Sequence, residues 1–369
     1  MSKDVINGPR RAFLGTSAAL LSGAVMGGRT LAAPADAAPQ AGAVKMPAVI
    51  GYPNEKGVTI QRVTYRARNL GTSIVANLFL PAGITASRTY AAVVVTHPFG
   101  GVKEQTAGLY AQRLAEEGFI ALAYDASYQG ESGGEPRLME VPSQRLDDIS
   151  CAIDYLVQHP RVDAERVGSL GICAGGSYAL CQAQTEMRVK AVAAVSTFNL
   201  GEARREGMGT ISYEERMKRL RDAAAARSRE ARGEPVQLVP VVPDTPAAFT
   251  ERTPALYREG YDYYRTPRAQ HPNSPNRYMF SSLPQQMAFF PFDQLDTISP
   301  RPLLLIAGSK ADTLFWSQQV MQKAKDPKEL FIVDGASHMD MYDRPQFVTP
   351  AVAKLKEFFG RALAVDGTR

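Results

Sequence analysis

A cysteine between two glycines, at the junction of an apolar run and a helix-compatible run, most constrains this fold. Residues 167–172 are largely apolar, Gly171-Ile-Cys173-Ala-Gly175 follows, and Ser177 begins a run suited to a helix. Strand, sharp turn and helix in this order form a nucleophile elbow. Glycines two residues before and after the apex avoid collisions with neighbouring elements. The pattern predicts a nucleophilic Cys173 whose thiolate is favoured by the helix N-terminus. The alternative is a buried structural cysteine.

Two later loops carry an acid and a histidine. Asp312 follows an apolar run through a Gly-Ser loop, and His338 follows the apolar run 330–333 through a loop of small residues. Ligand sites of open α/β sheets collect at the C-terminal ends of strands. The chain order nucleophile, acid, histidine is that of α/β-hydrolases. An imidazole would deprotonate the thiol, and a carboxylate would fix its tautomer. We therefore predict a triad of Cys173, Asp312 and His338.

Two serines compete for the role of nucleophile. Gly130-Glu-Ser132-Gly-Gly134 has the spelling of a serine elbow, but the preceding apolar run ends at Asp125 and no helix begins cleanly after it. We interpret Ser132 as part of a flexible loop near the site. Ser177 lies one helical turn beyond Cys173, away from the apex, and is not expected to attack.

Backbone amides in two loops are candidates for an oxyanion hole. The loop after the buried run 90–96 donates one N–H in this kind of fold, and the residue after the nucleophile donates another, which assigns Phe99 and Ala174. His97 is a candidate base, although positioning of this loop suits it better than catalysis. Glu104 either caps the next helix or lies near the thiol. We place His97, Glu104 and Tyr128 at the substrate pocket.

The N-terminal segment has the features of an export signal. Arg10 and Arg11 precede Phe-Leu and a mildly apolar, glycine-containing stretch, and an Ala-Asp-Ala segment ends at Ala37. Paired arginines of this kind resemble a twin-arginine signal. We expect residues 1–37 to direct the protein to the periplasm or the exterior, with cleavage after Ala33 or Ala37. An unprocessed, disordered N-terminus is the alternative.

Composition excludes several classes of protein. The 369 residues carry a net charge of +5 and show no basic stripe with interleaved aromatics, so no nucleic acid is expected. No cluster has zinc spacing, and neither a dinucleotide fingerprint nor a P-loop occurs, so no metal or cofactor is predicted. No stretch indicates stable membrane association. Cys151 and Cys181 fall on predicted helices and are expected to face the core. The predicted partner is a small-molecule acyl substrate, and no oligomeric state is assigned.

The chain divides where its alternation of strands and helices stops. Residues 45–198 and 300–365 alternate apolar runs with helical patterns, which indicates βαβ units, after an antiparallel hairpin at the sheet edge. Residues 199–299 are rich first in Arg, Glu and Ala and later in Tyr, Phe and Met. We predict an α/β-hydrolase fold, with a mostly parallel central sheet, helices on both faces and residues 199–299 inserted as a mostly helical cap.

Three segments resemble a known family: His97-Pro-Phe-Gly-Gly-Val-Lys-Glu-Gln, residues 125–137 and residues 171–176. They are similar to a bacterial branch of the α/β-hydrolase superfamily that resembles dienelactone hydrolases in its cysteine elbow and fungal polyketide acyltransferases in its overall pattern. The resemblance implies the triad and the oxyanion loop assigned above. It does not carry over lactone specificity, because dienelactone hydrolases are smaller and lack such an insertion.

These observations predict a cofactor-independent hydrolase of a carboxylic ester, lactone or thioester that works through an acyl-cysteine. Acyl transfer by the same intermediate is the first alternative, because an alcohol, amine or thiol can replace water in the second step. A catalytically inactive binding protein on the same fold is the second alternative.

Overall fold

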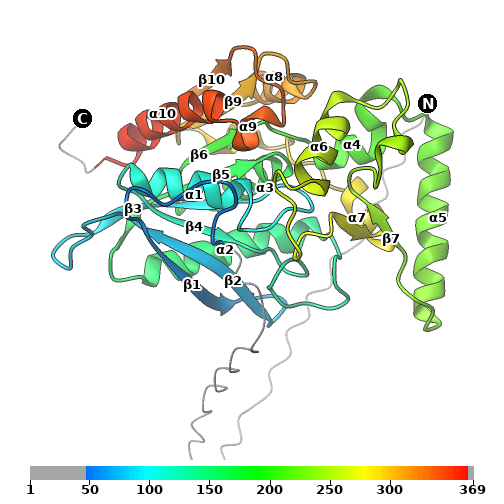
Figure 1. Ribbon diagram of the computed structural model, residues 1–369, viewed down its shortest axis with the longest axis horizontal. Helices are drawn as coiled ribbons and strands as arrows, with labels where there is room; N and C mark the ends of the chain where they lie inside the picture. Colours follow the sequence, from blue (N-terminus) through cyan, green and yellow to red (C-terminus); the bar gives the residue numbers. More distant parts are fainter. Residues whose placement is uncertain (1–46, 365–369) are drawn as a thin grey trace, which may run out of the picture. The chain divides into compact units, whose positions relative to one another are not determined.

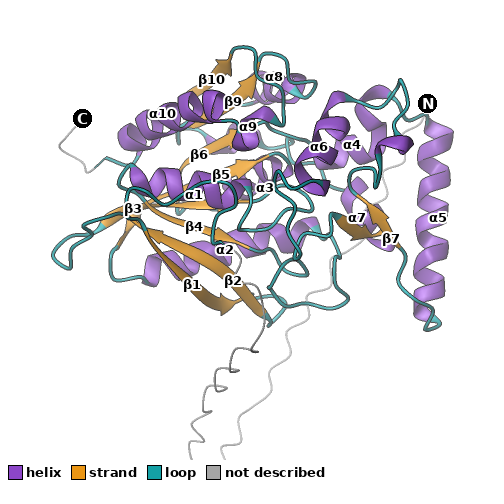
Figure 2. Ribbon diagram, in the orientation of Figure 1, coloured by secondary structure: helices purple, strands orange, loops and turns teal. Residues whose placement is uncertain are grey.

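The computed structural model describes residues 47–364. The expected export signal and its cleavage sites lie outside this range. The described residues form an eight-stranded sheet flanked by helices, with a second group of helices beside the ends of the strands (Figures 1 and 2). None of the helices described is both long and apolar enough to cross a membrane.

The central sheet has the order β1-β2-β4-β3-β5-β6-β9-β10. All neighbouring strands from β4 to β10 are parallel, whereas β1 and β2 form the predicted antiparallel hairpin at one edge. Val95 of β3 lies opposite Ala123 on one side and Leu170 on the other. The strands are β1 Thr59–Arg66, β2 Ser73–Leu80, β3 Tyr90–Thr96, β4 Ile120–Tyr124, β5 Val162–Ile172, β6 Val189–Val195, β9 Leu303–Gly308 and β10 Lys328–Val333.

Helices cover both faces of this sheet (Figure 1). Helices α1 and α10 pack together on one face, while α2, α3 and α8 cover the other. Strands β3, β4 and β9 are buried at almost every residue, which explains why each is a continuous apolar run without alternation. The helices are α1 Thr106–Glu116, α2 Pro142–Gln158, α3 Ala174–Ala183, α8 Leu314–Lys323, α9 Asp340–Asp343 and α10 Pro345–Ala362. The α/β-hydrolase fold predicted from the sequence is therefore confirmed.

Residues 199–299 depart from this alternation between β6 and β9. Asn199 caps α4 and Ser212 caps α5, each side chain accepting a hydrogen bond from a first-turn amide. A short two-stranded ribbon joins the helices of this insertion. Its elements are α4 Leu200–Glu206, α5 Tyr213–Ala231, β7 Leu238–Pro240, α6 Ala255–Arg265, β8 Arg277–Met279 and α7 Leu283–Met287. We refer to this segment as the cap.

Candidate active site

Cys173 occupies the sharp turn between β5 and α3. Its backbone has φ 58° and ψ −123°, a strained conformation for a residue with a side chain. A Cβ on Gly171 would collide with the carbonyl of Gly175, and a Cβ on Gly175 would collide with the carbonyl of Thr96. Both glycines are therefore required by the close approach of the helix to the strands. The turn holds Cys173 at the C-terminal edge of the sheet.

Two backbone amides converge on the sulfur of Cys173. The N–H groups of Phe99, in the loop after β3, and of Ala174, the first residue of α3, both donate toward Sγ. An acyl oxygen attached to the carbon that Sγ attacks would meet the same pair of donors. This arrangement can stabilise an oxyanion at a tetrahedral centre.

His338 lies in the loop after β10 and is almost completely buried. Its Nδ1 lies 2.6 Å from the hydroxyl oxygen of Thr313, and its Nε2 lies 3.5 Å from the hydroxyl oxygen of Tyr342. The Tyr342 hydroxyl also forms a hydrogen bond with the Cys173 thiol. The Tyr342 hydroxyl therefore connects the thiol with the imidazole.

Asp312 does not contact His338 as the sequence led us to expect. Its Oδ2 accepts a hydrogen bond from the amide of Leu256, at 3.0 Å, in the first turn of cap helix α6. Pro254 begins that helix without a side-chain cap, so Asp312 supplies one from the core. Thr313, the next residue along the chain, instead lies beside Nδ1 of His338. Burial raises the pKa of the Asp312 carboxyl.

Burial outweighs the helix dipole at the thiol. Desolvation raises the pKa of Cys173 to about 11, although hydrogen bonds from Tyr342 and the two amides oppose this shift. Desolvation also lowers the pKa of His338 to about 3. The resting pair is thus a neutral thiol and a neutral imidazole, and the thiolate expected from the position at a helix N-terminus is not the ground state. A neutral imidazole remains competent to accept a proton.

The cap closes a small apolar cavity over Cys173. The cavity has a volume of about 40 Å³, enough for a few water molecules but not for an acyl substrate. The wall opposite the core is contributed by residues of the cap. The lining residues are Phe99, Cys173, Phe198, Arg204, Val241, Val242, Leu256, Tyr257, Gly260, Tyr264, Met339 and Tyr342.

His97 positions the oxyanion loop and does not line the cavity, so the sequence expectation of a pocket residue is corrected. Nδ1 donates to the carbonyl of Pro98 at 2.7 Å, whereas Nε2 accepts from the amide of Ala126 at 3.1 Å and faces Arg145 at 2.9 Å. Desolvation and the charge of Arg145 hold the pKa of His97 well below its usual value. A histidine whose two nitrogens are both engaged fixes the loop that carries Phe99.

Glu104 and Tyr128 also lie outside the cavity. Glu104 pairs with the buried ammonium of Lys103 at 2.6 Å, and that ammonium also contacts Asp125. Tyr128 lies in the loop after β4 with φ 70°, and its ring packs against the backbone of Gly134. The sequence predicted both residues at the substrate pocket, but neither lines the cavity beside Cys173.

Neither serine that competes for the role of nucleophile is free to attack. The Ser132 hydroxyl donates to the carbonyl of Asp125 at 2.6 Å and accepts from the amide of Val75 at 2.8 Å. The Ser177 hydroxyl donates to the carbonyl of Ala174 at 2.9 Å inside α3. Both hydroxyl groups are engaged with the backbone. Ser132 is buried and held by two hydrogen bonds, whereas the sequence predicted a flexible loop there.

Sequence reasoning missed Thr313 and Tyr342. Thr313 was missed because the neighbouring Asp312 matched the acid expected in a triad. Tyr342 lies four residues after His338, a spacing that brings two side chains to the same face of a helical turn. That spacing was the one signal that could have identified it.

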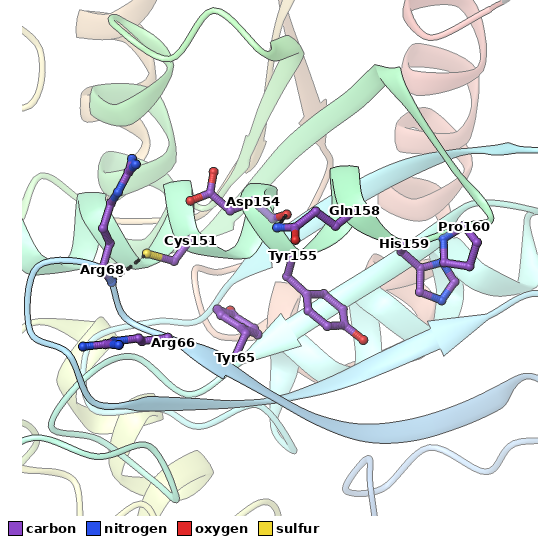
Figure 3. Close-up of a pocket in the computed structure, with 9 residues that line it drawn as sticks. All are labelled: Tyr65, Arg66, Arg68, Cys151, Asp154, Tyr155, Gln158, His159 and Pro160. Atoms are coloured by element: carbon purple, nitrogen blue, oxygen red, sulfur yellow. Dashed lines mark hydrogen bonds between the residues drawn. The ribbon is translucent and has the colours of Figure 1, made fainter. Parts of the chain in front are cut away.

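A second pocket, with a volume of about 730 Å³, lies between β1 and α2 (Figure 3). It contains Cys151 and His159, but Tyr155 and Gln158 lie between these two residues in Figure 3. Sγ of Cys151 accepts from the amide of Arg68 at 3.2 Å, and burial raises its pKa to about 11. In this pocket no base lies beside the cysteine in the way that His338 lies near Cys173. Within residues 47–364, no group of three or more His, Cys, Asp or Glu side chains could hold a metal ion.

The chain is similar to a known protein family and to several known proteins. The model of the dienelactone hydrolase family matches residues 76–202, which include Phe99, Cys173 and Ala174. The uncharacterized Escherichia coli K12 protein YcjY is 38% identical over 301 residues, covering 80% of this chain and 97% of that protein.

Two further relatives have solved structures. Protein PA2218 of Pseudomonas aeruginosa is 36% identical over 297 residues, 79% of this chain and 78% of that protein. Its crystal structure has a TM-score of 0.78 at 34% identity and covers 84% of this chain and 96% of that one. The polyketide transferase GrgF of a Penicillium species is 25% identical over 263 residues, 69% of this chain and 83% of that protein. The structure of GrgF, described as an α/β-hydrolase, has a TM-score of 0.71 at 21% identity, covering 83% of this chain and 100% of that one, and supports the fold alone.

Proposed function

Because this chain belongs to the α/β-hydrolase superfamily and matches its dienelactone hydrolase family, we propose that it hydrolyses a carboxylic ester, lactone or thioester through an acyl-cysteine intermediate. The observation that carries this proposal is the convergence of the Phe99 and Ala174 amides on the Cys173 sulfur, with His338 reached through the Tyr342 hydroxyl.

In the first step, Sγ of Cys173 attacks the acyl carbon. The thiol proton passes to Nε2 of His338, directly or through Tyr342, as the S–C bond forms. The negative charge on the acyl oxygen is held by the two amides. Collapse of this intermediate breaks the bond to the leaving group, which takes the proton from His338. In the second step, water attacks the acyl-cysteine while His338 accepts its proton, and the thiol is regenerated with release of the acid.

The role of Asp312 as the third member of the triad depends on the position of the cap. In the closed arrangement Thr313 holds Nδ1 of His338, and Asp312 is engaged by Leu256. Substrate needs more room than the cavity offers, so α6 must move, and that movement releases the Asp312 carboxylate. We propose that Asp312 then supports the imidazolium that forms during the reaction.

Acyl transfer is a second candidate, favoured by the similarity to the polyketide transferase GrgF. In this version an alcohol, amine or thiol replaces water in the second step. The two reactions are distinguished by measuring the products at increasing concentrations of an added acceptor. A transferase forms more of the acyl-acceptor product, whereas a hydrolase releases the free acid at an unchanged rate.

Localisation remains a proposal that rests on the sequence. The paired arginines and the small-residue segment before residue 38 support export to the periplasm or the exterior. Fractionation of cells that express the full chain tests it, and full-length protein confined to the cytosol would overturn it. We propose a small-molecule acyl substrate, with neither nucleic acid nor a stable membrane association.

The test of the proposed reaction compares the chain from residue 38 onward with Cys173→Ala and Ser132→Ala on a p-nitrophenyl ester and a butyryl thioester. We expect both activities to vanish only in Cys173→Ala, with an acyl-enzyme detectable by mass spectrometry in the parent protein. Activity retained in Cys173→Ala would overturn the proposed nucleophile. An absence of hydrolysis and transfer in the parent protein would favour the inactive binding protein.

A further inference from the structure

A fixed guanidinium lies in the otherwise uncharged wall of the catalytic cavity. Among the residues that line the cavity beside Cys173, Arg204 is the one with a formal charge. Its guanidinium carbon lies 4.7 Å from the ring centroid of Phe99 and 4.7 Å from that of Tyr278. Its Nε donates to Oε1 of Gln286 at 2.9 Å. Two aromatic rings and one hydrogen bond therefore fix the orientation of the guanidinium next to an oxyanion-hole residue.

The same arginine also lines an open groove on the outer side of the cavity wall. This groove has a volume of about 580 Å³ and shares Arg204, Val241, Val242 and Tyr257 with the inner cavity. A substrate that extends from the cavity past these shared residues would have its reacting carbonyl at Cys173 and its remaining part in the groove.

The groove contains a second cation without a matching acid. Arg219 of α5 lines it and donates from one terminal nitrogen to the backbone carbonyl of Arg204 at 3.0 Å. Within residues 47–364, no carboxylate oxygen lies within 4.0 Å of either guanidinium. Asp244, the acid among the groove residues, is already paired with Arg265 at 2.9 Å and Arg277 at 2.8 Å. The charge of the groove is therefore positive and unbalanced.

We propose that Arg204 and Arg219 form a subsite for an anionic group of the substrate, a carboxylate or a phosphate, and so select anionic acyl esters or thioesters. Carboxylate and phosphate are the groups that a planar guanidinium binds with paired, charge-assisted hydrogen bonds. An uncharged substrate would leave both guanidinium groups without a counter-charge next to a largely apolar cavity. This inference rests on the proposed function in taking Cys173 as the attacking group.

Two matched pairs of compounds test the subsite. Mono-p-nitrophenyl glutarate and p-nitrophenyl pentanoate differ by a carboxylate on the acyl side. S-butyryl-4′-phosphopantetheine and S-butyryl-pantetheine differ by a phosphate on the leaving side. Calorimetry on Cys173→Ala measures binding without turnover. We expect the anionic member of at least one pair to bind tenfold or more tightly than its neutral twin, and the pair that responds identifies the side that carries the anion.

Variants then assign the preference to these arginines. In the Cys173→Ala background, Arg204→Gln and Arg219→Gln should each reduce the anionic-to-neutral ratio of binding constants about tenfold, whereas Arg221→Gln, exposed on the same helix and outside the groove, should keep it. Each ratio compares two compounds on the same variant. A general loss of binding-competent protein therefore affects both compounds equally and does not change the ratio. Arg219→Gln also tests the subsite if Arg204→Gln does not fold. Ratios within threefold of one for both pairs, or a preference that survives both substitutions, would overturn the inference.

The outcomes also separate this inference from the proposed reaction. Turnover of the neutral compounds by the parent protein, abolished in Cys173→Ala, supports the reaction whether or not anions are preferred. An anion preference in the calorimetry without any turnover by the parent protein supports the subsite and contradicts the reaction.

Discussion

The hydroxyl oxygen of Thr313 lies 2.6 Å from Nδ1 of His338, in the place where the sequence predicts a carboxylate. A neutral hydroxyl can fix the orientation and tautomer of the ring, but it offers no charge to stabilise an imidazolium. This agrees with the low pKa of His338 in the closed site. We therefore propose that this arrangement is a resting state and that the reacting state has the cap displaced.

Thr313→Val should lower kcat by about ten- to a hundredfold, because it leaves a buried ring nitrogen without a partner at a cost of about 1–3 kcal/mol. We expect KM to stay within threefold, since Thr313 does not line the cavity. Thr313→Ser retains the hydroxyl and should restore most of the activity. Steady-state kinetics of the three proteins check this, and an unchanged kcat in Thr313→Val would contradict a positioning role.

Asp312→Asn separates the charge of Asp312 from its contact with α6. An asparagine can still accept from the Leu256 amide, so the free energy of unfolding should change little. If Asp312 supports the imidazolium after the cap opens, kcat should fall by at least about tenfold, because a charge is lost next to a forming cation. Thermal unfolding and kcat measured together test this. A kcat equal to that of the parent protein would assign Asp312 to the cap alone.

Tyr342→Phe removes the hydroxyl that connects the thiol with the imidazole. We expect the first-order rate of cysteine acylation to fall by about tenfold or more, because proton transfer by a positioned group contributes at least this much. The ring remains, so the packing against Tyr263 is retained. Tyr263→Phe, which removes a hydroxyl from the neighbouring ring outside the cavity lining, is the matched control. Equal rates of burst-phase product release in Tyr342→Phe and the parent protein would exclude Tyr342 from the proton path.

The buried His338 predicts an acid-dependent loss of stability. Its pKa is lowered to about 3 in the folded protein, whereas the ordinary histidine value is about 6.5. Between these values the unfolded chain binds a proton that the folded protein does not, so stability falls as pH falls, by at most about 1.4 kcal/mol per pH unit for this group. Denaturant unfolding of His338→Asn between pH 4 and 6.5 should show a correspondingly smaller slope. A slope equal to that of the parent protein would contradict the assignment.

The elbow glycines predict a contrast between two alanine substitutions. Gly171→Ala places a Cβ against the backbone of Gly175, which cannot yield as a flexible side chain would, and should destabilise the fold by at least about 2 kcal/mol. Gly360→Ala lies in α10 with open space around its Cβ and should stabilise the fold by up to about 1 kcal/mol. Chemical denaturation of both variants measures the difference, and a tolerated Gly171→Ala would contradict the packing argument.

Local pattern alone determined the sheet, the elbow and the two amides that face Cys173. Continuous apolar runs identify buried parallel strands, and the spacing of Gly171 and Gly175 identifies a turn, because both signals depend on neighbours along the chain. The placement of Cys173 next to the amides of Phe99 and Ala174 follows once strands and turns are assigned, since the C-terminal ends of parallel strands share one edge.

Only the tertiary structure decided what each polar side chain contacts. Asp312 meets Leu256 across 56 residues, and His97 meets Arg145 across 48 residues. Whether Thr313 or Asp312 contacts His338 depends on the position of α6 against the sheet. Hydrogen-bond partners are selected by which groups packing brings within about 3 Å, and no local pattern encodes that distance. For the same reason the closure of the cavity, and the neutral thiol and imidazole inside it, follow from burial by the cap and not from the residues of the motif.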